Sequence, residues 1–239
     1  MNKSDFFKTV KITLPIFFGY LSIGIPFGLM VTNAGYAWYL APLMSLVMYT
    51  GTGQYIAIGM FAAGANLASI MVIQALVGIR HIFYGLSLIT KFKDAGKWKP
   101  YLIFALTDET YAVLCSVDVP QDLKPGPFYG TIAALDHFYW TLGATIGAVA
   151  GSLIKISLEG VDFALTALFA VILVEQISSS KDFVPPAIGI ASAALAAILE
   201  RRGIFPQGNM LLFALAFGIA ALILAKQHQF SGKFSSRKK

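Results

Sequence analysis

The sequence predicts an all-α protein, a polytopic bundle of about seven transmembrane helices forming one integral membrane domain over residues 1–239. The chain is 57% hydrophobic and only 13% charged, whereas soluble domains carry about 25% charged residues. Long apolar runs without period-2 alternation recur along it, and most approach the roughly 17–25 residues that a spanning helix needs. These runs cover residues 10–30, 40–63, 67–89, 101–117, 128–154, 161–177, 184–199 and 210–225.

The distribution of basic residues suggests how the chain lies in the membrane. They gather at the N-terminus, in the segment 91–99, at Arg201-Arg202 and in a tail of about residues 226–239. The net charge of +6 therefore reflects topology and lipid attraction rather than a nucleic-acid surface. By the positive-inside tendency, we expect the N-terminus, the 91–99 loop and the tail to be cytoplasmic, and the loop 118–127 to be external. An even number of crossings must separate two cytoplasmic segments. Three apolar runs lie between the N-terminus and the 91–99 loop, so one of these runs is not a simple span.

The segment 36–63 is the expected exception, because Thr50-Gly51-Thr52-Gly53-Gln54 interrupts it. Glycine costs about 1 kcal/mol relative to alanine in a helix interior. Irregular backbone at membrane depth is tolerated only where protein buries it or where it lines a cavity. We therefore expect a discontinuous or re-entrant helix near residues 50–54, as found at the solute sites of transporters. The alternative is a continuous helix with a packing glycine.

Two other runs carry packing signals. Pro15 and Pro26 in the first run predict a kinked or broken helix. Gly143, Gly147 and Gly151 recur every four residues and so share one helix face. Such a stripe of small residues allows two helix backbones to approach closely, in this chain or between chains.

Ionisable residues stand in pairs inside the apolar runs: Arg80-His81, Asp108-Glu109 and Asp136-His137. Each such group costs roughly 2.5–3.5 kcal/mol on insertion scales, so together they indicate a solute path, a proton relay or a buried ion-pair lock. Adjacent side chains on a helix point in different directions. The two members of each pair are therefore expected to face different neighbours.

Each of these residues has a functional and a structural interpretation. The guanidinium of Arg80 can bind a substrate carboxylate or can form a structural pair with one of the carboxylates. His81 and His137 can relay protons near neutral pH or can serve in helix packing. We expect a substrate-binding group and a proton-coupling or ion-pair group: Tyr49, Thr50, Gly51, Thr52, Gly53, Gln54 and Arg80 for the substrate, and His81, Asp108, Glu109, Asp136 and His137 for protons or ion pairs.

No enzymatic constellation is recognisable. The sequence contains no H-E-x-x-H, no G-x-S-x-G and no P-loop, and its single cysteine, Cys115, offers no disulfide framework. We expect neither a metal nor a cofactor. A solute gradient or an ion gradient would have to supply the energy for transport.

Several of these segments resemble the AzlC-type branched-chain amino acid exporters. Residues 44–54, with the sequence MSLVMYTGTGQ, are similar to a signature of that family, as is Arg80-His81 followed by YGLSL at 84–88. The stretch TDETY at 107–111 and the segments 162–165 and 168–169 match in the same order, so the resemblance covers about residues 10–178. One departure is Gly78, where the family often carries an asparagine.

The resemblance implies the large subunit of a two-component exporter in the bacterial inner membrane, working with a small AzlD-type membrane protein. Its implied substrates are leucine, isoleucine, valine, and methionine or analogues, expelled from the cytoplasm. The substrate carboxylate would meet residues 50–54 or Arg80, and its ammonium group would meet Asp108 or Asp136. Carboxylates that also exchange protons would couple export to the proton gradient.

Two other functional classes fit the same composition. A passive channel for another small polar or zwitterionic solute would not require titratable residues and would not respond to an opposing proton gradient. A scaffold or assembly subunit would use the ion pairs only as locks, so apolar replacement of both partners would be tolerated.

Overall fold

The computed structural model describes residues 3–154, 170, 173–174, 177–178, 181–204, 210 and 213–224. Every regular element within these ranges is a helix, which confirms the all-α prediction. The helices form two compact units, Met1–Gly59 with Gln74–Thr166 and Met60–Ile73 with Ala167–Lys239. That residues 1–239 act as one transport domain stays a prediction, and the motif at 162–169 and the basic tail lie outside the described residues.

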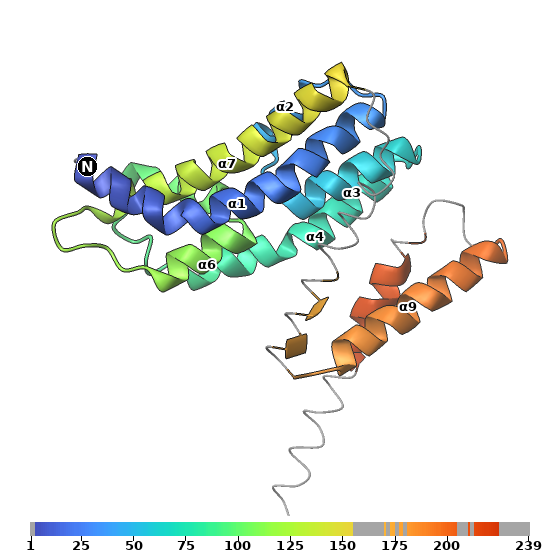
Figure 1. Ribbon diagram of the computed structural model, residues 1–239. Coiled ribbons are helices and arrows are strands. Elements are labelled where there is room, and N and C mark those ends of the chain that lie inside the picture. The colour runs from blue at the N-terminus through green and yellow to red at the C-terminus, as the bar shows by residue number, and fades with distance from the viewer. Residues whose placement is uncertain are drawn as a thin grey trace, which may run out of the picture. The chain divides into compact units, whose positions relative to one another are not determined.

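The frame of the first unit is a pair of long parallel helices, α1 (Lys3–Asn33) and α7 (Pro125–Leu153), which lie side by side in Figure 1. The glycine stripe of α7 makes their close approach possible, because a Cβ at Gly143 or Gly147 would meet backbone atoms of Tyr20 or Ile25 in α1. The partner of the stripe is thus α1 of the same chain.

The first run is predicted to form a kinked or broken helix; α1 is continuous through Pro15 and Pro26 and so is not broken, and the kink stays a prediction.

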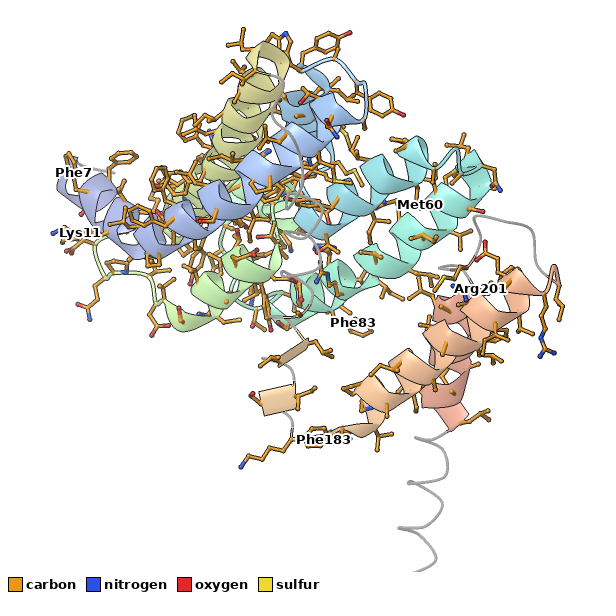
Figure 2. The ribbon with its side chains drawn as sticks, turned by 45° about the vertical axis from the view of Figure 1, so that its right-hand side comes forward. Phe7, Lys11, Met60, Phe83, Phe183 and Arg201 are labelled. Carbon is orange, nitrogen blue, oxygen red and sulfur yellow. The ribbon has the colours of Figure 1, made fainter. Side chains whose placement is uncertain are left out.

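Three described helices are long and apolar enough to cross a membrane: Asp5–Asn33 within α1, Leu67–Ser87 (α4), and Val184–Arg201 (α9). Several apolar side chains on α4 are exposed; Phe83, for example, is 64% exposed (Figure 2). The helix α7 is also long enough, but it carries polar residues such as Asp136 and His137 and buries about half of its residues. The count of seven spans stays a prediction.

The segment after α1 forms a helical hairpin, which we call hairpin 1 (residues 40–62). It consists of α2 (Leu40–Val47) and α3 (Gly51–Ala62), and the chain reverses at residues 48–50, where Tyr49 takes a positive φ of 35°. The return is visible in the contacts of α3: Tyr55 donates a hydrogen bond to the carbonyl of Ile23, and Gly59 lies near Met30. Hairpin 1 therefore enters and leaves at the Leu153 end of α7.

The predicted discontinuous helix is confirmed, with its break slightly earlier than expected. Residues 51–54 form the first turn of α3, where the N–H of Gln54 bonds to the carbonyl of Thr50 at 2.8 Å.

A second hairpin, hairpin 2 (residues 99–116), consists of α5 (Lys99–Phe104) and α6 (Asp108–Ser116). Between them, Thr107 starts α6 by accepting the N–H of Thr110 in its side-chain oxygen. The short 3-10 helix η1 (Gly96–Trp98) precedes α5 and packs on the start of α7. At the other side of hairpin 2, the ammonium of Lys91 donates to the last carbonyls of α6, those of Leu114, Cys115 and Val117.

These contacts place both ends of hairpin 2 at the Pro125 end of α7. The apolar run 101–117 therefore does not cross the unit. The segments 91–99 and 118–127, expected from the sequence on opposite sides, lie at the same end of this unit, because the hairpin returns the chain to the end from which it entered. The side of the membrane that each faces stays a prediction.

The segment of α4 from Gln74 to Ser87 connects the two hairpins. The side chain of Gln74 donates to the carbonyl of Gly53 at 2.8 Å, and Ser87 donates to the hydroxyl of Tyr111 at 2.9 Å. Since hairpin 1 turns back, α1 and α4 are the two helices that carry the chain from the N-terminus to the 91–99 loop. This even number is what the basic residues require.

In the second unit, α9 starts with Pro185 and Pro186 in its first turn. Proline is tolerated there because the backbone N–H that it lacks would have no partner within the helix. The helix buries Ser192 and Ala196. Gly218, in the short apolar helix Phe213–Leu224, lies against Ser192.

Candidate functional site

The tips of the two hairpins meet at the middle of α7. The ring of Tyr49 stacks on His137 with centroids 4.1 Å apart, and Phe104 lies 6.4 Å from Tyr49 and 5.9 Å from His137. Nε2 of His137 lies 3.0 Å from the carbonyl of Ser45, and Nδ1 lies 3.2 Å from the hydroxyl of Tyr101. A carbonyl only accepts, so Nε2 carries a proton. The imidazole thus joins both hairpins to α7, as a packing histidine would.

Next to this junction lies a carboxylate with spare hydrogen-bonding capacity. Asp136 is fully buried, and its Oδ2 accepts a 2.9 Å hydrogen bond from the hydroxyl of Thr110. Its Oδ1 has no hydrogen-bond partner among the described residues. The hydroxyl of Tyr49, which is 2% exposed, interacts with Asp136, Thr110 and Tyr20 but forms no hydrogen bond of good geometry with a described residue. Unsatisfied buried polar atoms are rare and require an explanation.

A second carboxylate faces α1. The hydroxyl of Tyr20 lies 2.6 Å from Oγ1 of Thr107 and donates a 3.0 Å hydrogen bond to Glu109. Within the described ranges, neither Glu109 nor Asp136 forms an ion pair.

The third carboxylate has a cationic partner. Arg80 and Asp108 form a 2.6 Å ion pair with both side chains about one-third exposed, at 30% and 36%. Tyr84 donates a further 2.6 Å hydrogen bond to Asp108 and stacks on Tyr111. This geometry fits the structural interpretation of Arg80. Asp108 therefore faces α4 while Glu109 faces α1, as the helical spacing predicts.

Of the remaining predicted residues, His81 lies apart from the junction and bonds to the carbonyl of Gly78 in its own helix. Gln54 is fully buried, donates to Ser45 Oγ at 3.2 Å and accepts from the indole N–H of Trp140 at 2.8 Å. Gly51 also lies against the Trp140 ring.

The rest of the glycine-rich segment closes the turn of hairpin 1. Thr52 is half-buried, and Gly53 leaves no room for a Cβ beside Thr50 and Gln74. The hydroxyl of Thr50 is buried without a partner among the described residues.

Sequence reasoning missed the hydroxyl, amide and indole groups that complete this region. They are Tyr20, Ser45, Gln74, Tyr101, Thr110 and Trp140.

Comparison with known proteins identifies the family of this chain. The model of the AzlC protein family matches residues 15–154. The branched-chain amino acid transport protein AzlC of Bacillus subtilis is 34% identical over 78% of this chain and 74% of its own. An uncharacterized membrane protein of Helicobacter pylori strain J99 is 35% identical over 93% of this chain and 97% of its own. The inner membrane protein YgaZ of Escherichia coli is 28% identical over 94% and 92%. No solved structure matches the chain.

The matched region contains both hairpins and the polar junction between them. The relatives are membrane proteins, and the described helices include candidate membrane spans. The chain therefore belongs to the AzlC family, as a multi-pass transport protein of the bacterial inner-membrane type.

Proposed function

We propose that the chain is a secondary transporter that exports branched-chain amino acids from the cytoplasm, namely leucine, isoleucine and valine, and methionine or analogues. The relative from B. subtilis is named for branched-chain amino acid transport, and the resemblance of the signature segments supports the same solute class.

The observation that carries the proposal is the meeting of two oppositely entering hairpins at a buried polar junction. Discontinuous helices of this kind form the solute sites of many secondary transporters. In the first turn of α3 the N–H groups of residues 51–53 precede the first helical hydrogen bond, so they are available to a substrate carboxylate. Side chains such as Phe104 and Tyr49 supply apolar surface for the substrate tail.

We further propose that export is coupled to protons and requires a small AzlD-type membrane subunit, with residues 1–239 acting as one transport domain. Asp136 and Glu109 are the groups best suited to exchange protons, because neither pairs with a cation among the described residues.

The test is efflux of preloaded labelled leucine from cells that express this chain with and without a small AzlD-type subunit. We expect efflux to need both proteins and to stop when the proton gradient is collapsed. Efflux that continues unchanged without the gradient would favour a passive channel. No efflux from cells that express both proteins well would exclude leucine as the substrate.

A further inference from the structure

We propose that Asp136 and Tyr49 form a site for a monovalent cationic group, which the α-ammonium of the transported amino acid occupies. The inference rests on the proposed function only in naming the occupant. The site itself follows from the hydrogen bonds and charges at the junction of the hairpins.

The first argument is the unused acceptor capacity. A carboxylate oxygen only accepts hydrogen bonds, and a tyrosine hydroxyl can accept as well as donate. Oδ1 of Asp136 and the hydroxyl of Tyr49 are both buried without a hydrogen-bond partner in the described part of the chain. An ammonium group has three donors and a positive charge, so it matches what these two atoms lack.

The second argument is the balance of charge. A buried carboxylate needs a compensating cation or a proton. Arg80, the cation of the neighbouring helix, is already paired with Asp108 at 2.6 Å. The imidazole of His137 is engaged at both nitrogens by Ser45 and Tyr101. No described cation is thus available to Asp136, so its carboxyl group either holds a proton or meets a positive group from outside the described side chains.

The structure also selects between two carboxylates that could meet the ammonium. Asp108 is occupied by Arg80 and Tyr84 and is about one-third exposed. Asp136 is fully buried and has one free oxygen. Because Asp136 has a free carboxylate oxygen and Asp108 already has two partners, the ammonium site is assigned to Asp136.

The position of α3 suits the other end of a zwitterion. Trp140, which contacts Gly51 at the start of α3, follows Asp136 by four residues, or about 6 Å along α7. A substrate with its ammonium at Asp136 can therefore direct its carboxylate toward the first N–H groups of α3.

The test uses the full chain, purified in lipid nanodiscs, with two fragments of leucine and one inorganic cation as probes. Isopentylamine has the ammonium and the apolar tail of leucine without the carboxylate, 4-methylpentanoate has the carboxylate and tail without the ammonium, and sodium is an inorganic cation. Binding is measured as a shift of the melting temperature and by competition with labelled leucine.

We expect isopentylamine to bind the unmodified chain and to compete with leucine. Asp136→Asn should weaken amine binding by about tenfold or more, since a charge-assisted hydrogen bond is lost. Asp122→Asn, the same change at an exposed loop position, should leave binding unchanged. Tyr49→Phe keeps the ring that stacks on His137 and should weaken amine binding by about threefold to tenfold. This variant tests the site even if Asp136→Asn fails to fold.

The proposal is overturned if isopentylamine does not bind, or if it binds the Asp136 and Tyr49 variants as tightly as the unmodified chain. Stabilisation by sodium alone, dependent on Asp136, would overturn the ammonium assignment in favour of an inorganic cation. Amine binding that depends on Asp136, without any leucine efflux, would support the cation site and reject the proposed leucine export.

Discussion

Hairpin 1 and hairpin 2 both turn back at the middle of α7, yet interactions of different kinds hold them there. Charged groups fix hairpin 2: Arg80 pairs with Asp108, and Lys91 binds the carbonyls at the end of α6. Neutral amides and rings hold hairpin 1, through Gln54 with Trp140 and through Gln74 with the backbone of Gly53.

The difference extends to the tips themselves. At the tip of hairpin 2, Thr107 caps α6 and is also bonded to Tyr20. At the tip of hairpin 1, the hydroxyls of Tyr49 and Thr50 are buried without hydrogen-bond partners in the described ranges, and Tyr49 has a positive φ. Strained backbone and unused polar atoms are typical of functional positions. Hairpin 2 is thus the anchored element, and hairpin 1 presents the groups that a solute can use.

The largest expected effect is in thiol labelling, which reports the side of the membrane on which the two ends of each hairpin lie. In a Cys115→Ser background, Lys93→Cys and Asp122→Cys should react with an impermeant thiol reagent from the same side. Ala37→Cys, in the turn before hairpin 1, should react only from the opposite side. Labelling of positions 93 and 122 from opposite sides would mean that residues 99–116 cross the membrane.

The next effect is the loss of the charge that fixes hairpin 2. Arg80→Ala should lower the free energy of unfolding by about 2–3 kcal/mol, because Asp108 loses its cation at a site that is only partly buried. Unfolding in mixed micelles with increasing dodecyl sulfate measures the loss. A double replacement of Arg80 and Asp108 by Leu should restore most of it, and transport by the double variant would show that the pair is only a lock. Stability restored without transport would instead show that one of the charges contacts the solute.

A smaller effect is expected in hairpin 1. Gln54→Leu should cost about 2 kcal/mol, because the indole N–H of Trp140 stays buried without its acceptor. The double variant Gln54→Leu with Trp140→Phe should be little less stable than Gln54→Leu alone, since the indole N–H that lost its acceptor is then also removed. If the two single changes add fully in the double variant, measured by the same unfolding titration, the hydrogen bond between the two side chains does not stabilise hairpin 1.

The smallest effect is at the open end of hairpin 2. Lys91→Met should cost about 1 kcal/mol, since its hydrogen bonds to three carbonyls are lost at a partly exposed position. Lys93→Met, at an exposed position in the same loop, is the matched control and should be neutral. Equal stability of the two variants would contradict a role for Lys91 in holding α6.

The sequence predicts hairpin 1 because two glycines and three polar residues in a row cannot form an ordinary helix centre. It also contains a signal for hairpin 2. Thr107, followed by Asp108 and Glu109, has the composition of a helix start, and it lies in the middle of the apolar run 101–117. A helix that begins in the middle of such a run implies a break before it.

The rest of the site could not be found in this way. Tyr20, Thr110 and Trp140 are ordinary residues of membrane helices, and nothing in their local sequence shows which polar group they will meet. Their partners lie far along the chain; Tyr20 and Thr107, for example, are separated by 87 positions. Only the packing of α1, the hairpins and α7 brings these groups together.

The pairing of α1 with α7 also sets the order in which the protein can assemble during synthesis. Thr13 of α1 bonds to Tyr139, which follows it by 126 positions. At about 5–20 residues per second, a ribosome needs roughly 6 to 25 s to supply the missing helix. During that time Gly24 and Gly28 of α1, which pack against the backbone of α7 in the finished protein, and both hairpin tips lack the helix that covers them. An unfinished chain therefore differs from a finished one in its exposed hydroxyls and amides, which gives membrane quality control a feature to recognise.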